Sequence, residues 1–218
     1  MRCFNRARRR FLAQNVTTQF DSVFPELPSH SALYQYSVEN RQDFWNRIAL
    51  SSIHFERPYE SVCTSDFDTG HVEWFRGGRM NASFNSIDVH LNDRGDQTAF
   101  YWEGDELGDE RQITYNELHD LVAQFSNYFR RLGLGPGDRV ALYLPTCIEA
   151  VAAMQATVRI GAIHATVFAG FSHGALRSRV NDCQAKLVIT MDSSFRGGRE
   201  IPLRDTAIVR CQTVSVDY

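Results

Sequence analysis

Lysine is almost absent from this sequence. Lys186 is the only one, although lysine and arginine together number 23. Chemistry that needs a side-chain amine therefore has a single candidate. Lys186 opens the apolar run 186–190, which predicts a buried strand. We therefore expect Lys186 to lie in a core strand, where it cannot act as a catalytic lysine.

Long hydrophobic runs are also missing. The longest weakly polar stretch, residues 160–171, is interrupted by His164, Thr166 and Gly170, whereas a membrane-spanning helix needs about 20 apolar residues. We expect no membrane span. The formal net charge of −3 offers no general attraction to nucleic-acid phosphates, so a nucleic-acid partner is not expected. The hydrophobic fraction of 43% is that of a globular chain.

Several catalytic motifs are missing as well. The sequence has no G-x-x-x-x-G-K-[ST] loop, no G-x-G-x-x-G, no G-x-S-x-G and no H-E-x-x-H. Its five cysteines form no C-x-x-C pair, and its seven histidines have no ligand spacing. The acidic segment 103–110 lies between two expected strands, which predicts a solvated turn. We assign no catalytic and no metal-binding residue, and we expect reduced cysteines.

The first 30 residues form a basic leader. Residues 1–20 contain Arg2, Arg6, Arg8, Arg9 and Arg10 and no acidic residue. An arginine-rich, acid-free start with interleaved apolar side chains is typical of a mitochondrial transit peptide. It predicts the mitochondrial matrix, and a solvated basic tail on a cytoplasmic protein is the alternative.

Residues 31–93 are expected to form a helical extension. Apolar side chains recur near helical spacing between Leu33 and Leu50, and again between Ala82 and Asn92. The first stretch predicts one or two short helices and the second predicts one more. Glycines, prolines and scattered aromatic residues at 54–80 predict an ordered irregular segment between them.

Residues 94–204 have an α/β pattern. Strand runs at 98–102 and 111–114 flank the acidic turn and predict a hairpin. The capping box Thr114-Tyr-Asn-Glu117 then opens a helix with an apolar stripe. The strands and helices that follow alternate, which predicts a parallel sheet with right-handed crossovers. The strands are expected at 139–144, 162–168 and 186–190, and the helices at 148–159 and from 175.

The loops after these strands are the candidate sites, because ligands of parallel sheets bind beyond the carboxyl ends of the strands. The loops are Pro145-Thr146, 168–172 and 191–199. Gly170 would let the backbone of its loop approach a ligand. Arg196 and Arg199 flank two glycines, and guanidinium groups bind phosphate bidentately. Ordinary turns are the alternative for both segments, since a similar R-G-G-R lies at 76–79, outside the expected sheet.

Collinear motifs over residues 33–204 resemble the N-terminal part of acetyl-CoA synthetases, which belong to the adenylate-forming superfamily. They include W-F-R-G-G-R-M-N at 74–81, I-T-Y-N-E-L at 113–118, V-F-A-G-F-S at 167–172, A-K-L-V-I-T at 185–190 and R-G-G-R-E-I-P at 196–202. The resemblance implies an incomplete parallel-sheet α/β part of the adenylation domain at 94–204. Residues 205–218 do not resemble the family's continuation and are expected to be a divergent tail.

The resemblance implies ATP-dependent activation of acetate to acetyl-AMP and transfer of the acetyl group to coenzyme A, with Mg²⁺ and ATP as further substrates. A family segment for the phosphate-bearing end of coenzyme A corresponds to Arg196, Gly197, Gly198 and Arg199. A turn beside coenzyme A corresponds to Phe168, Ala169 and Gly170. Three positions depart from the family: Arg199 replaces a lysine, Ala169 replaces a glycine, and Val89 stands where members often carry arginine.

The family's phosphate loop, carboxylate pocket, magnesium glutamate and catalytic lysine have no counterpart in the matched stretch. We therefore expect this chain to be an N-terminal fragment that is inactive alone. Two alternatives remain open. The chain could bind coenzyme A or a nucleotide without turnover, or it could pair with a full-length synthetase as a truncated modulator. Only the resemblance favours acetate over propionate.

Overall fold

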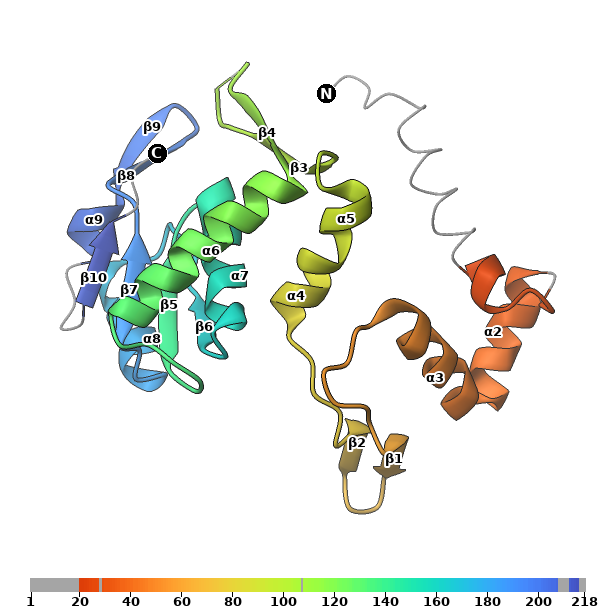
Figure 1. The fold of residues 1–218 in the computed structure, drawn as a ribbon. Helices are drawn as coiled ribbons and strands as arrows, with labels where there is room; N and C mark the ends of the chain where they lie inside the picture. The colour runs from red at the N-terminus through yellow and green to blue at the C-terminus, as the bar shows by residue number, and fades with distance from the viewer. Residues whose placement is uncertain (1–19, 28, 107, 208–211, 216–218) are drawn as a thin grey trace. The chain divides into compact units, whose positions relative to one another are not determined.

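A computed structural model describes residues 20–27, 29–106, 108–207 and 212–215 (Figure 1). Most of the basic leader and much of the tail 205–218 lie outside the described residues, so what we expect of these two segments stays a prediction. The chain divides into two compact units, Met1–Met80 and Asn81–Tyr218. None of the described helices is long and apolar enough to cross a membrane.

The first unit contains two helices and a hairpin. Helices α2 (His30–Glu39) and α3 (Arg41–Ser52) confirm the helices expected between Leu33 and Leu50. Strands β1 (Ser61–Asp66) and β2 (His71–Arg76) pair antiparallel, so the expectation of an irregular segment at 54–80 was wrong there. Asp66 accepts a hydrogen bond from the amide of Asp68, and Gly70 has φ +69°. The turn joins two strands in which polar and aromatic residues are mixed. Their sequences therefore lack the regular alternation of apolar and polar residues from which a strand is predicted.

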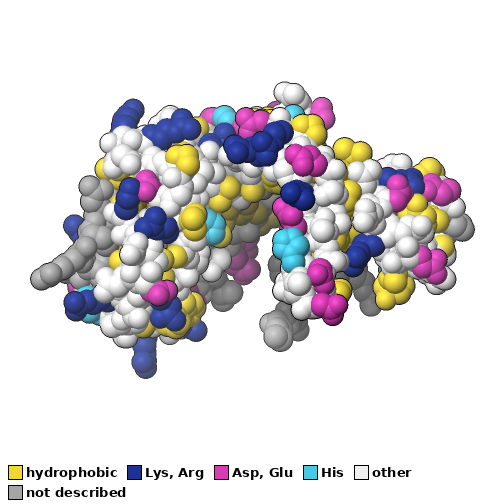
Figure 2. All heavy atoms as spheres, turned by 90° about the horizontal axis from the view of Figure 1, so that it is seen from below, with side chains coloured by type: hydrophobic (Ala, Val, Ile, Leu, Met, Phe, Trp, Pro, Cys, Tyr) yellow, Lys and Arg dark blue, Asp and Glu magenta, His cyan; other side chains and the backbone are white. Residues whose placement is uncertain are grey.

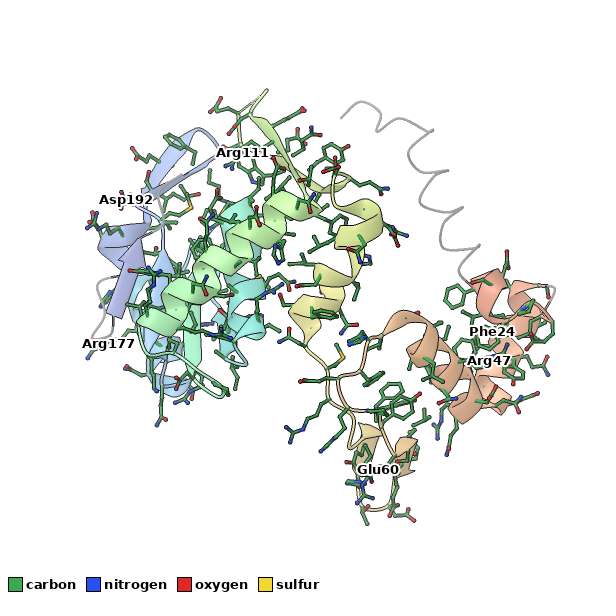
Figure 3. All side chains as sticks on the ribbon, in the orientation of Figure 1. Phe24, Arg47, Glu60, Arg111, Arg177 and Asp192 are labelled. Carbon is green, nitrogen blue, oxygen red and sulfur yellow. The ribbon has the colours of Figure 1, made fainter. Side chains whose placement is uncertain are left out.

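Aromatic packing holds the first unit together. The rings of Phe24 and Phe44 stack with centroids 5.0 Å apart. The Arg47 guanidinium lies over the Phe24 ring, 4.2 Å from its centroid. Figure 3 labels both side chains. Arg47 also pairs with Glu26 at 2.5 Å. The charged end of Arg47 therefore stays paired while its guanidinium covers an apolar ring.

The second unit begins with three short helical pieces in place of the single helix expected at 82–92. They are α4 (Ala82–Ser86), the 3₁₀ helix η1 (Asp88–His90) and α5 (Leu91–Arg94). The break falls at Ile87, whose backbone is not helical and whose side chain is 1% exposed. Burying Ile87 in the core outweighs continuing the helix. These pieces belong to the second unit because Asn81 donates to the carbonyl of Arg159 at 3.1 Å. The division therefore falls before residue 93.

The predicted hairpin and capped helix are confirmed. Strands β3 (Thr98–Glu103) and β4 (Glu110–Thr114) pair antiparallel and lead into α6 (Tyr115–Arg131). The Thr114 hydroxyl accepts from the Glu117 amide at 3.2 Å, and the Glu117 carboxylate accepts from the Thr114 amide at 2.8 Å. These two hydrogen bonds form the capping box. The amide and the hydroxyl of Thr114 both donate to the Glu117 carboxylate, which lowers the pKa of Glu117. The helix therefore starts where the sequence predicts.

A four-stranded parallel sheet forms the centre of the second unit and confirms the predicted α/β class. Its order is β10 (Gln212–Ser215), β7 (Leu187–Thr190), β5 (Arg139–Tyr143) and β6 (Ile163–Thr166). Helices α7 (Ile148–Arg159) and α8 (His173–Asp182) connect β5 to β6 and β6 to β7. Because the two connections run in opposite directions along the sheet, right-handed crossovers place these helices on opposite faces. Figure 1 shows α6 lying along the sheet, and α6 packs against α7.

We had expected Lys186 to lie in a core strand, and this expectation was wrong. Its side chain is 56% exposed, and its ammonium is 2.5 Å from Asp138 Oδ1. This ion pair lowers the pKa of Asp138. Lys186 immediately precedes β7, whose residues Leu187–Thr190 are all buried, so the apolar run begins one residue later than the sequence pattern suggested.

Candidate functional site

The Arg-Gly-Gly-Arg segment is the turn of a hairpin. Strands β8 (Ser193–Arg196) and β9 (Arg199–Pro202) follow β7 and pair antiparallel. Gly197 and Gly198 connect them with φ +59° and +70°. Two consecutive residues with positive φ make the tight turn that suits a two-residue hairpin, and glycine adopts it without strain. The register places Arg196 directly opposite Arg199.

This register leaves two positive charges facing each other. Side chains of directly opposed hairpin residues share one face, with Cβ atoms about 5 Å apart, and like charges there repel. Within the part of the chain that the structure describes, the ion pairs involve other cations and neither of these arginines. Both side chains are exposed. An anion between the two guanidinium groups would remove the repulsion, which makes this face of the hairpin a candidate anion site.

The turn after β6 meets this face of the hairpin. The Arg196 guanidinium lies 5.2 Å from the ring centroid of Phe168. A Cβ atom added to Gly170 would lie 2.8 Å from the Phe168 ring and 3.4 Å from an Arg196 nitrogen. The structure thus brings the two predicted segments together, 168–170 and 196–199. A side chain at position 170 would displace the ring on which Arg196 rests.

Hydrogen bonds from Tyr143 hold the backbone of the turn 168–171. The side chain of Tyr143, at the end of β5, is fully buried, and its hydroxyl donates to the carbonyl of Phe171 at 2.8 Å. The carbonyl of Ala169 is 3.3 Å from the same hydroxyl. Burial raises the pKa of Tyr143, so the hydroxyl stays protonated and remains a donor over the physiological pH range.

The acidic turn between β3 and β4 reaches the same hairpin. The Gly198 amide donates to a carboxylate oxygen of Asp105 at 3.2 Å. We expected the acidic segment to be a solvated turn. Asp105 is indeed exposed, but its carboxylate occupies the amide of Gly198. An anion that used the Gly198 amide would have to displace this carboxylate.

The β3–β4 hairpin is anchored beside the ends of the parallel strands. The Trp102 indole donates to the carbonyl of Thr146 at 2.6 Å. Arg111, labelled in Figure 3, pairs with the buried Glu149 of α7 at 3.3 Å. These contacts connect β3 to the loop after β5 and β4 to the first turn of α7, so Asp105 is carried on a supported hairpin.

A cavity of about 430 Å³ lies between the β3–β4 hairpin and the carboxyl ends of β5 and β7. Its lining includes Trp102, Thr146, Cys147, Met191 and Phe195. This is the position where parallel sheets bind ligands when the strand order reverses. The cavity therefore confirms that the loops after these two strands border a hollow, but it does not include Phe168 or Gly170.

Cys147 in this cavity is not a nucleophile at neutral pH. Burial raises the pKa of its thiol to about 11. Its sulfur accepts from the Ala150 amide at 3.3 Å and lies 3.9 Å from the Met191 sulfur. Cys147 thus caps α7 in its protonated form. Among the described residues, no group of three or more His, Cys, Asp or Glu could hold a metal ion.

Strand β8 connects the cavity to the arginine pair. Its residues Ser193, Ser194 and Phe195 line the cavity, and the next residue, Arg196, stacks on Phe168. On the side of the molecule drawn in Figure 2, Lys and Arg side chains are spread over several places among acidic and apolar ones.

Comparison with known families gives two adjoining matches. A model of the AMP-binding enzyme family matches residues 87–217. A model described as the acetyl-coenzyme A synthetase N-terminus matches residues 30–86. The first match includes most of the segment 205–218, for which we had expected a divergent tail, and β10 of that segment pairs with β7 in the sheet.

Individual relatives point the same way. The chain is 44% identical over 199 residues to acetyl-coenzyme A synthetase 1 of Pseudomonas aeruginosa, which covers 89% of this chain and 30% of the relative. It is 45% identical over 203 residues to an acetyl-coenzyme A synthetase of Methylorubrum extorquens, covering 91% and 31%.

A solved structure of acetoacetyl-CoA synthetase from Streptomyces lividans superimposes with a TM-score of 0.75. The two are 26% identical, and the match covers 86% of this chain and 29% of that one. The chain thus spans about three-tenths of the length of the relatives that it matches.

Proposed function

The chain belongs to the AMP-binding enzyme family, and from that premise we propose that it is the N-terminal part of an acetate–CoA ligase. In the proposed reaction, a carboxylate oxygen of acetate attacks the α-phosphorus of ATP, which gives acetyl-AMP and releases pyrophosphate. The thiol of coenzyme A then attacks the acetyl carbonyl, which gives acetyl-CoA and releases AMP. The identity of 44–45% to acetyl-coenzyme A synthetases over about nine-tenths of the chain supports this proposal.

Within that reaction, we assign the described residues to coenzyme A. The observation that carries the assignment is the opposed pair Arg196 and Arg199, with Arg196 resting on Phe168 beside Gly170. Two guanidinium groups on one face can bind a phosphate with charge-assisted hydrogen bonds. The 3′-phosphate of coenzyme A is such a group, and the exposed Phe168 offers a flat apolar surface beside it. ATP and Mg²⁺ are assigned to no residue of this chain.

The assignment separates binding from catalysis. We expect the purified 218-residue chain to bind coenzyme A in a calorimeter and to show no acetate-dependent exchange between ATP and pyrophosphate. Exchange should appear when the chain is part of a protein as long as its relatives. Clear exchange by the pure chain would contradict the division, and absence of coenzyme A binding would contradict the residue assignment.

The structure also predicts a variant that binds more tightly. Asp105→Ala removes the carboxylate that occupies the Gly198 amide, so this donor becomes open to a phosphate oxygen. A hydrogen bond contributes about 0.5–1.5 kcal/mol net, and we expect the affinity for coenzyme A to rise about three- to tenfold. Calorimetric titration measures it.

Asp109→Ala is the matched control for this variant, because it removes one carboxylate from the same acidic turn. Asp109 has no contact with the Gly198 amide. An equal rise in both variants would mean that net charge alone sets the affinity and that the Asp105 contact has no role.

A further inference from the structure

Tyr143 is the one polar side chain in the buried strand β5 that reaches the turn 168–171. Its residue is 1% exposed. Phenylalanine would fill the same space, and a buried hydroxyl is costly unless it is hydrogen bonded. The hydroxyl is bonded here, to the carbonyl of Phe171 at 2.8 Å and beside that of Ala169 at 3.3 Å. These two carbonyls flank Gly170.

The turn in its bonded form presents a ring to Arg196. The rings of Phe168 and Phe171 meet edge to face with centroids 5.7 Å apart. Arg179 of α8 lies over the Phe171 ring at 4.5 Å. Phe171 is therefore held through its backbone by Tyr143 and through its ring by Arg179. Phe168 rests on this fixed neighbour and carries the Arg196 guanidinium at 5.2 Å.

We propose that Tyr143 is a positioning residue for the phosphate-bearing end of coenzyme A. Its hydroxyl fixes the turn 168–171, the turn fixes the Phe168 ring, and the ring sets the direction of the Arg196 guanidinium. Tyr143 itself does not touch the ligand. The inference rests on the proposed function, since it concerns the same arginine pair. It adds that a hydroxyl buried in the sheet controls how strongly the 3′-phosphate is recognised.

The test compares coenzyme A with 3′-dephospho-coenzyme A, which lacks only that phosphate. The wild-type chain should bind coenzyme A more tightly than the dephospho form. In Tyr143→Phe we expect the affinity for coenzyme A to fall about three- to tenfold, the size of one weakened hydrogen bond from Arg196 to the 3′-phosphate, with little change for the dephospho form. Calorimetry gives both constants.

Tyr59→Phe is the matched control. The Tyr59 hydroxyl donates to the Asn46 side chain at 2.6 Å in the first unit. The variant therefore removes a hydrogen-bonded hydroxyl that does not bond to the turn 168–171. Both constants should stay at their wild-type values in this variant. An equal loss of preference in both variants would overturn the proposal, because the effect would then be one of general stability.

A double-mutant cycle separates positioning from packing. If Tyr143 acts through Arg196, then Tyr143→Phe must have no effect on coenzyme A affinity in an Arg196→Ala background. Additive losses would overturn the proposal. Phe168→Leu, which leaves Tyr143 in place and removes the ring, must also lose the preference and covers the case in which Tyr143→Phe does not fold.

The outcomes also distinguish this inference from the proposed function. A wild-type chain that prefers coenzyme A, together with a Tyr143→Phe variant that keeps the preference, overturns the role of Tyr143 and leaves the arginine site standing. A wild-type chain with no preference for the 3′-phosphate overturns the arginine assignment, and the role of Tyr143 falls with it.

Discussion

Replacing Arg196 and Arg199 together by alanine is expected to weaken coenzyme A binding by more than tenfold. The two guanidinium groups face each other on one side of the β8–β9 hairpin, and no ion pair within the described ranges engages them. Their charge is therefore available to a ligand phosphate. A hydrogen bond to a charged group contributes about 1.5–3 kcal/mol, so the loss of even one such bond exceeds a factor of ten. Calorimetric titration with coenzyme A measures the change.

The chain provides a matched control with the same spacing. Arg76-Gly-Gly-Arg79 lies in the first unit, where Arg76 pairs with Glu73 at 3.8 Å and Arg79 forms a backbone bridge with Arg57. Arg76→Ala with Arg79→Ala removes the same charge and should leave coenzyme A affinity unchanged. Equal losses in the two double variants would show that bulk charge, and not the hairpin, attracts the ligand.

Arg159→Ala is expected to lower the free energy of unfolding by about 3 kcal/mol, the size typical of breaking a buried ion pair. The Arg159 guanidinium, at the end of α7, contacts both carboxylate oxygens of Asp88, one of them at 3.1 Å. The two side chains are only 22% and 16% exposed. Alanine would leave the Asp88 carboxylate without its main partner, with the His119 ring 3.7 Å away. Urea unfolding followed by circular dichroism measures the loss.

Arg204→Ala is the comparison for this variant. Arg204 pairs with Asp192 at 3.2 Å, but the side chains are 66% and 58% exposed. Water and salt screen such a pair, so we expect a loss below about 1 kcal/mol. The Arg159 Nε is buried without a hydrogen-bond partner, and alanine relieves that cost, which places the expected loss near the lower end for buried pairs. Losses of similar size in both variants would contradict this account.

The parts of the fold that the sequence predicts are those set by local patterns. Thr114 and Glu117 are three residues apart and hold each other, so the start of α6 can be located from the sequence. The strands around 139–144 and 187–190 follow from apolar runs. The break at Ile87 could not be predicted, because it depends on a core made by residues far along the chain. The exposure of Lys186 could not be predicted either, because its partner Asp138 lies far away in the sequence.

The candidate site shows the same limit. Resemblance identified Arg196 to Arg199 and Phe168 to Gly170, but spacing alone does not define the turn. At 197–198 both glycines have positive φ, whereas at 77–78 only Gly77 does. The same four letters thus form different turns. The Asp105–Gly198 and Trp102–Thr146 contacts join residues 93 and 44 positions apart, and no local signal links such positions.

Lys186 offers a single side-chain amine for coupling the protein to a surface. Apart from the terminal amine it is the only primary amine in the sequence, and its side chain is 56% exposed. It stands at the amino end of β7, while the β8–β9 hairpin follows the carboxyl end of the same strand. A molecule coupled through Lys186 would therefore be tethered in a defined orientation on a sensor surface, with Arg196 and Arg199 facing the solution at the far end of the strand.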